Sequence, residues 1–155
     1  MNTLIIICAK YLIIVPALGL GYYFLKANRR TKKKIFILSL LALPLTYLVA
    51  KVGSYIYFDP RPFVEGNFVP LFSHSVDNGF PSDHTLLASA FASVLFMFKR
   101  SEGLILLFVS FVIGFARVLA GVHHVVDIFG SILISLIITS LVNYLLNKYS
   151  NIYKN

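Results

Sequence analysis

Charged residues are scarce in this sequence. They make up 13% of its 155 positions, whereas a soluble domain typically has about 25%. Cysteine occurs once, at Cys8, which excludes an internal disulfide. Internal repeats, low-complexity segments and a boundary to a second domain are also missing, so residues 1–155 are predicted to form a single domain. The N-terminus has neither a basic region nor a small-residue cleavage site, so its first apolar run is predicted to be a retained span and not a signal peptide.

Long apolar runs take up most of the chain. Hydrophobic residues account for 58% of it, and several runs approach the roughly 20 residues that a helix needs to cross a bilayer. These properties predict an all-α, polytopic membrane protein with about five spans. The predicted spans are 4–25, 35–58, 82–98, 104–119 and 125–146.

The basic residues are predicted to set the topology. The formal net charge of +8 is compatible with nucleic-acid binding, but basic loops of membrane proteins usually lie in the cytoplasm. The dense basic segment 26–34 is therefore placed inside, and no nucleic-acid partner is predicted. With five spans, the turn at Lys99 and Arg100 and the C-terminal tail also lie inside. The loops 59–84 and 119–124 then lie outside the cell membrane.

The resulting arrangement gathers chemically active side chains at the extracytoplasmic face. Ionisable groups at membrane depth are costly and are therefore functional candidates. All four histidines fall on this side, together with two arginines, one lysine and one aspartate. The set comprises Lys51, Arg61, His74, His84, Arg117, His123, His124 and Asp127.

The cations of this set suit a phosphate ligand. Lys51, Arg61 and Arg117 would offset the charge that spreads over phosphoryl oxygens during transfer. Ser82 stands at the predicted start of the third span, where unpaired backbone N–H groups favour an anion. These four residues are predicted to bind phosphate.

Two of the histidines are predicted to have different catalytic roles. His123 and Asp127 are i and i+4, so on a helix they share a face and the carboxylate can hold the imidazole in one tautomer. His123 is predicted to be a nucleophile that forms a phospho-imidazole, with Asp127 as its orienting partner. His84 is predicted to be the general acid that protonates the leaving oxygen.

Two alternatives compete with this interpretation. Histidine and aspartate also bind metals, but the neighbouring cations would repel a divalent ion and no HExxH spacing is present. No metal or cofactor is therefore predicted. The second alternative is that these polar residues pair with each other and only pack the helix bundle.

Three short motifs carry a family resemblance. They are Lys51 followed by Arg61-Pro62, then Pro81-Ser82-Asp83-His84, and then Arg117-x5-His123-x3-Asp127. With these motifs the sequence resembles the type-2 phosphatidic acid phosphatase superfamily of membrane phosphatases. The resemblance implies the same roles for the nucleophile, its partner, the acid and the phosphate-binding residues.

Further residues resemble one bacterial branch of that superfamily. The segments 60–64, 73–74 and 80–85 are similar to the undecaprenyl-diphosphate phosphatases linked to bacitracin resistance. This resemblance implies metal-independent removal of the terminal phosphate from an isoprenoid lipid diphosphate outside the cytoplasmic membrane. That reaction recycles the lipid carrier used in cell-wall biogenesis.

The sequence departs from the family pattern in several places. Ala116 stands where a serine usually precedes the arginine, more residues separate Lys51 from Arg61 than in the general motif, and the family usually has one more span. Phosphatidate and phosphatidylglycerophosphate remain alternative substrates, and a non-catalytic protein that binds anionic lipid remains an alternative function. The sequence indicates no oligomeric state.

Overall fold

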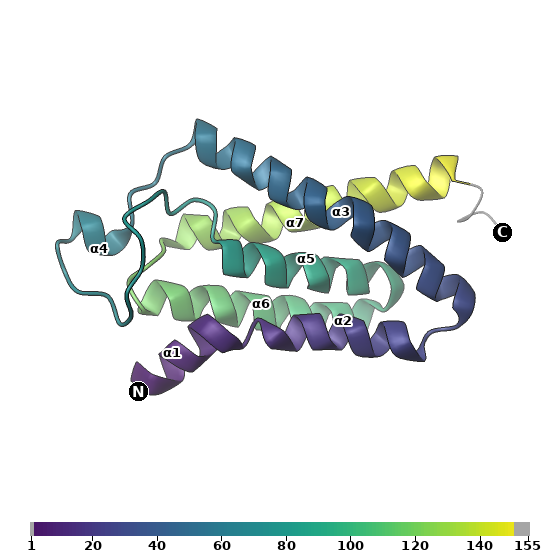
Figure 1. Ribbon diagram of the computed structural model, residues 1–155, viewed down its shortest axis with the longest axis horizontal. Coiled ribbons are helices and arrows are strands. Elements are labelled where there is room, and N and C mark those ends of the chain that lie inside the picture. Colours follow the sequence, from purple (N-terminus) through teal and green to yellow (C-terminus); the bar gives the residue numbers. More distant parts are fainter. Residues whose placement is uncertain (1, 151–155) are drawn as a thin grey trace.

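The computed structural model describes residues 2–150, and over this range it contains helices and no strand. Figure 1 shows the long helices lying roughly along one axis. The predicted all-α fold of a polytopic membrane protein is confirmed. The helices are α1 (Asn2–Tyr11), α2 (Ile14–Lys26), α3 (Arg29–Ile56), α4 (Pro62–Glu65), α5 (Asp83–Phe98), α6 (Arg100–Leu119) and α7 (Val125–Tyr149).

The helix α5 forms the centre of the bundle. It packs against α2, α3, α6 and α7. Its buried side chains are mostly small, for example Ala88, Ala92 and Ser93, and small residues let helix backbones approach closely. The Ser89 hydroxyl donates to the Ser135 hydroxyl of α7 at 2.9 Å. This bond satisfies polar groups that would be costly to leave unpaired in an apolar core.

The number of spans agrees only partly with the prediction. Within residues 2–150, α3, α6 and α7 are each long and apolar enough to cross a membrane. The helices α1 and α2 qualify only together and are bent by 42° at the break between them, and α5 is a shorter apolar helix. The predicted count of five spans therefore stays a prediction.

The run 4–25, predicted as one span, is divided into α1 and α2. Pro16 lies in the first turn of α2, where a proline fits because N–H groups there need no helical partner. It cannot donate to the carbonyl of Leu12, which instead accepts from the Val15 N–H at 3.0 Å. The break therefore follows from the missing proline N–H. It leaves the last carbonyls of α1, including that of Ala9, without helical donors.

The two ends of the bundle differ in charge. In Figure 1, α4 and the α6–α7 connection lie at one end, and the α2–α3 and α5–α6 connections and the end of α7 lie at the other. The second end carries a concentration of basic residues. They are Lys26, Arg29, Arg30, Lys32, Lys33, Lys34, Lys99, Arg100 and Lys148. The histidines cluster at the α4 end, as the topology argument predicted.

We predict that Gly103→Ala destabilises the fold by about 2–3 kcal/mol, the upper range for an overpacked core. A Cβ at this position would lie 2.3 Å from Cα of Phe96 and 2.6 Å from its backbone nitrogen. Neither atom can move without shifting α5. The measurement is thermal or denaturant unfolding in detergent.

Gly21→Ala in α2 is the matched control, because a Cβ there meets nothing within 4 Å. Alanine is also the better helix former by up to about 1 kcal/mol. Equal unfolding midpoints for the two variants would show that α5 and α6 do not pack this closely around Gly103.

Candidate active site

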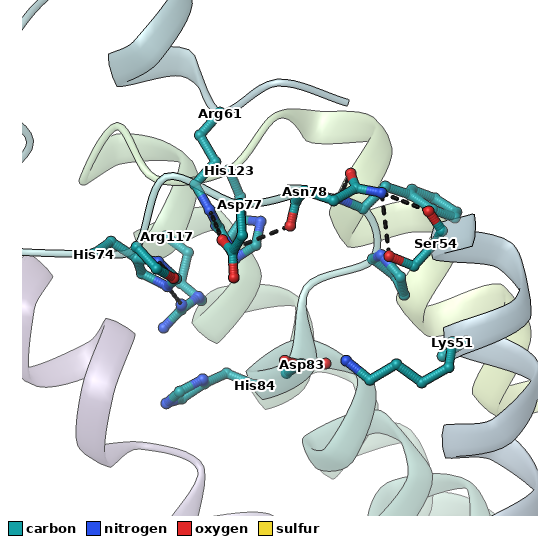
Figure 2. Close-up of a pocket in the computed structure, with 14 residues that line it drawn as sticks. Lys51, Ser54, Arg61, His74, Asp77, Asn78, Asp83, His84, Arg117 and His123 are labelled. Carbon is teal, nitrogen blue, oxygen red and sulfur yellow. Dashed lines mark hydrogen bonds and ion pairs between the residues drawn. The ribbon is translucent and has the colours of Figure 1, made fainter. Parts of the chain in front are cut away.

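A cavity of about 400 Å³ opens at the α4 end of the bundle. It brings together side chains from α3, α5, α6, the 57–82 loop and the α6–α7 connection, and Figure 2 shows many of them pointing inward. Five residues that the sequence predicts for the site line it. These are Lys51, Arg61, His84, Arg117 and His123.

His123 is fixed by the first turn of α7. Its Nδ1 lies 3.0 Å from Oδ2 of Asp127, and because a carboxylate accepts only, Nδ1 carries the proton. The other ring nitrogen, Nε2, is then unprotonated and lies 3.3 Å from Nη1 of Arg61. The ring is almost fully buried, at 2% exposure. The predicted pair is therefore formed, and the Nε2 lone pair lies at the cavity wall, where it accepts from Arg61.

Asp127 is itself held by the helix that it begins. It occupies the third helical position of α7, and its Oδ2 also accepts the backbone N–H of His124 at 2.9 Å. A carboxylate at this position is favoured by the unpaired N–H groups and the positive end of the helix. The side chain is fully buried. The carboxylate thus has one orientation before any ligand binds.

Arg61 crosses the cavity from the start of α4. Its Nη1 donates to the carbonyl of Val122 at 2.8 Å, and its Nε donates to Oδ1 of Asp77 at 2.8 Å. Oδ1 of Asp77 also lies 2.7 Å from Nη2. The guanidinium is buried, so these acceptors offset the cost of removing its charge from water.

Arg117 faces the same cavity from α6. Its Nη1 donates to the carbonyl of Ala9 at 3.1 Å, which is one of the α1 carbonyls freed by the Pro16 break. Its Nη2 lies 3.0 Å from Nε2 of His74. Its Nε has no hydrogen-bond partner among the described residues, although the side chain is only 2% exposed. A buried donor without a partner is costly, and a phosphate oxygen would satisfy it.

Burial and positive charge keep two imidazoles neutral. Burial lowers the pKa of His123 well below its ordinary value of 6.5, and the guanidiniums of Arg117 and Arg61 lower it further. Burial, followed by Arg61 and Arg117, also lowers the pKa of His74. A lowered pKa disfavours the imidazolium. Both rings therefore stay neutral to a lower pH than an ordinary histidine does.

Three predicted residues occupy less central positions. Figure 2 shows His84 extending from the start of α5 towards the Arg117 side, and Lys51 reaching in from α3. Nζ of Lys51 also lies 5.1 Å from the ring centre of Tyr47, a cation–π distance. Ser82 precedes α5 but is fully buried, and its hydroxyl accepts from Thr85 at 3.1 Å. The Ser82 side chain does not cap α5 and is not among the lining residues.

Asn78 fixes the long loop to α3, a role that sequence analysis did not detect. Its Nδ2 donates to the carbonyls of Ser54 at 2.7 Å and Tyr57 at 2.9 Å. Its Oδ1 accepts the backbone N–H groups of Asp59 at 2.9 Å and Phe80 at 3.0 Å. A single amide thus joins the end of α3 to both ends of the loop. Asparagine is common in loops, so its presence alone gave no signal.

Gly79 lets the loop approach the catalytic pair. A Cβ there would lie 3.1 Å from Oδ2 of Asp127 and 3.0 Å from the carbonyl oxygen of Asp59. A side chain here would therefore push the Asp127 carboxylate or the Asp59 carbonyl aside by a few tenths of an ångström.

One group of described side chains has a geometry that metal sites also show. Potential ligand atoms of Asp59, His124 and Asp127 lie within 4.8 Å of one another. However, Asp127 already accepts two N–H donors on Oδ2, and Arg61 lies on the other side of His123. We assign no metal ligand, and metal independence stays a prediction.

Comparison with known families gives a match over most of the chain. The model of the PAP2 superfamily matches residues 32–150. That segment includes every residue predicted for the site.

Individual relatives are similar over most of their length. The chain is 28% identical to the bacitracin transport permease protein BcrC of Bacillus licheniformis, covering 99% of this chain and 76% of the relative. It is 32% identical to undecaprenyl-diphosphatase BcrC of Bacillus subtilis, covering 89% and 71%. It is 34% identical to the putative undecaprenyl-diphosphatase YbjG of Escherichia coli, covering 88% and 69%.

A solved structure has the same fold. It is a transmembrane PAP2-type phosphatidylglycerolphosphate phosphatase from Bacillus subtilis. The TM-score is 0.57 at 23% identity, and the match covers 93% of this chain and 85% of the other.

We predict that Asn78→Ala destabilises the protein by about 2–4 kcal/mol, because several mostly part-buried hydrogen bonds of about 1 kcal/mol each are lost and their partners stay unpaired. Asn147→Ala is the control, since that exposed amide makes one bond, to the carbonyl of Asn143. Unfolding midpoints in detergent test the difference. Equal midpoints would mean that Asn78 does not anchor the loop.

Proposed function

The chain belongs to the PAP2 superfamily, and from this premise we propose that it hydrolyses the terminal phosphate of undecaprenyl diphosphate through a phospho-histidine intermediate. The membrane phosphatase class follows from the family match. The observation that carries the mechanism is the His123–Asp127 pair, whose unprotonated Nε2 faces a cavity containing two guanidiniums. We infer that His123, Asp127 and His84 are catalytic and that Arg61, Arg117 and Lys51 bind phosphate. Ser82 contributes only through its place before the start of α5, because its side chain does not line the cavity.

In the first step, Nε2 of His123 attacks the terminal phosphorus. An N–P bond forms as the bond from phosphorus to the bridging oxygen breaks, and the lipid monophosphate leaves. His84 gives its proton to that bridging oxygen. Asp127 stabilises the positive charge that develops on the ring through the Nδ1–H bond. Arg61 and the unpaired Nε of Arg117 bind the phosphoryl oxygens.

In the second step, water attacks the phosphorus of the phospho-imidazole. His84, now neutral, accepts a proton from this water, and the N–P bond breaks. Inorganic phosphate leaves, and both histidines return to their starting protonation states. Protons and charge balance over the cycle, so the reaction consumes only water.

The substrate assignment depends on the relatives. One relative that is 32% identical is named an undecaprenyl-diphosphatase, and a second carries that name as putative. The phosphatidylglycerolphosphate phosphatase supports the fold alone at its level of identity. The two guanidiniums and Lys51 favour a diphosphate over a monophosphate, because they offer more cationic contacts than one phosphate needs.

Charge placement supports the orientation. The basic end of the bundle carries the Lys26–Lys34 segment and the Lys99–Arg100 turn, which the positive-inside rule assigns to the cytoplasm. The cavity is at the other end. We therefore infer that the protein lies in the cytoplasmic membrane with its active site facing outward.

We predict that the purified protein releases phosphate from undecaprenyl diphosphate in excess EDTA, and that His123→Ala lowers the rate by at least about 10³-fold because the nucleophile is lost. Phosphate release in detergent is the measurement. The same assay also tests the alternative hypotheses of a metal requirement, a different lipid substrate and a non-catalytic function.

Loss of wild-type activity in EDTA would show that a metal is required. Activity on phosphatidate or phosphatidylglycerophosphate alone would reassign the substrate. Lipid binding without phosphate release would favour the non-catalytic function. Glu102→Gln serves as control, because that carboxylate lies at the basic end near Ser101.

We predict a bell-shaped dependence of kcat/KM on pH, with its acidic limb well below pH 6.5. The free enzyme needs neutral His123, and burial with two guanidiniums lowers the pKa of that ring. Activity therefore persists as pH falls through 6.5 and is lost only as the pH nears the lowered value. At high pH, activity falls as the general acid loses its proton. An acidic limb centred near 6.5 would show that the ring is not desolvated in solution.

A further inference from the structure

The carboxylate that orients His123 has a second carboxyl group beside it. Oδ2 of Asp127 accepts from His123 and from the His124 backbone. Oδ1 is buried and has no hydrogen-bond partner among the described residues. The neighbouring side chain is Asp59, which precedes the Pro60-Arg61-Pro62 turn and is itself 9% exposed.

Two buried carboxylates at this distance do not both stay ionised. Their oxygens lie within 4.8 Å of each other and of a His124 ring nitrogen. Burial raises the pKa of Asp59, and a hydrogen bond to Asp127 and the charge of Asp127 raise it further, while the contact with His124 lowers it by less. Like charges in a site of low dielectric favour sharing one proton. A protonated Asp59 supplies the donor that Oδ1 of Asp127 lacks.

His124 holds Asp59 in place for this contact. Its Nδ1 lies 3.2 Å from Oδ2 of Asp59, and its Nε2 lies 3.4 Å from Oε2 of Glu65. The backbone of Asp59 is fixed independently, because its N–H donates to Asn78 and its carbonyl accepts from Gly79. The charged and titratable groups around Asp59 are thus His124, Asp127, Glu65 and, through His123, Arg61.

We propose that Asp59 is a positioning residue whose protonated carboxyl group donates a hydrogen bond to Oδ1 of Asp127, and that His124 orients Asp59 by donating from Nδ1. This inference rests on the proposed phosphatase mechanism. Asp127 is then held through both oxygens, so it keeps its orientation when positive charge develops on His123. Asp59 does not touch the substrate. Its effect is therefore on kcat.

The test compares two replacements of Asp59 in the full-length protein. Asparagine keeps a donor to Oδ1 and an acceptor for His124, whereas alanine keeps neither. We expect Asp59→Ala to lower kcat roughly 10-fold or more, the usual effect of losing an outer hydrogen-bond partner, with KM within about two-fold. Asp59→Asn should retain most of the activity. Phosphate release and a thermal unfolding curve are measured for each variant.

Variants of His124 provide a second test, because that residue is partly exposed. It is also the N-cap of α7, so a thermal unfolding curve is measured for each of these variants as well. Glutamine can donate to Oδ2 of Asp59 and phenylalanine cannot, so His124→Phe should lower kcat several-fold and His124→Gln should not. This comparison holds even if Asp59→Ala does not fold. Glu102→Gln, at the opposite end of the bundle, is the control for removing a carboxylate.

The outcomes separate the two proposals. Active wild type with unchanged kcat in Asp59→Ala and His124→Phe would overturn the positioning role and leave the proposed function intact. Equal loss in Asp59→Asn and Asp59→Ala would show that a negative charge, and not a donor, is needed at this position. Wild type that hydrolyses no lipid phosphate would overturn the proposed function, and with it the role of Asp59.

Discussion

The site depends on the hydrogen bond from Nδ1 of His123 to Oδ2 of Asp127. The bond joins His123, in the connection between α6 and α7, to Asp127 in the first turn of α7. The start of α7 therefore also sets the tautomer of the imidazole. The same oxygen accepts a helix N–H, which means that helix initiation and ring orientation share one carboxylate. A change that shifts the start of α7 by one residue would therefore move the reactive nitrogen as well.

The second constraint is the cost of burying two guanidiniums beside each other in an apolar bundle. Each is offset by backbone carbonyls that ordinary helices do not offer. Arg61 bonds to Val122 in the turn before α7, and Arg117 bonds to Ala9 at the end of α1. Both acceptors exist because a helix stops there. Irregular backbone is tolerated at membrane depth where it serves a polar site, and here it holds the cations in place.

The sequence was sufficient to predict four of the long helices and the end of the bundle at which the histidines gather. Apolar runs predicted the positions of α3, α5, α6 and α7, and topology predicted that the histidines gather at one end. The i, i+4 spacing of His123 and Asp127 predicted their contact, because it is local. Specific contacts between residues far apart in the sequence could not be predicted. Neither the Arg117–Ala9 bond nor the Asp59–His124 contact leaves a periodic pattern in the sequence, since each joins segments at least 65 positions apart.

Ser82 illustrates a limit of motif reasoning. The family resemblance implied that Ser82 binds phosphate, yet its hydroxyl accepts from Thr85 inside the bundle. The α5 N-terminus still faces the cavity through Asp83 and His84. The backbone N–H groups of that first turn therefore stay available to an anion even though the serine hydroxyl points elsewhere. In this fold the motif serine contributes by its place before the start of α5. The N-terminal end of that helix, and not the serine hydroxyl, borders the site.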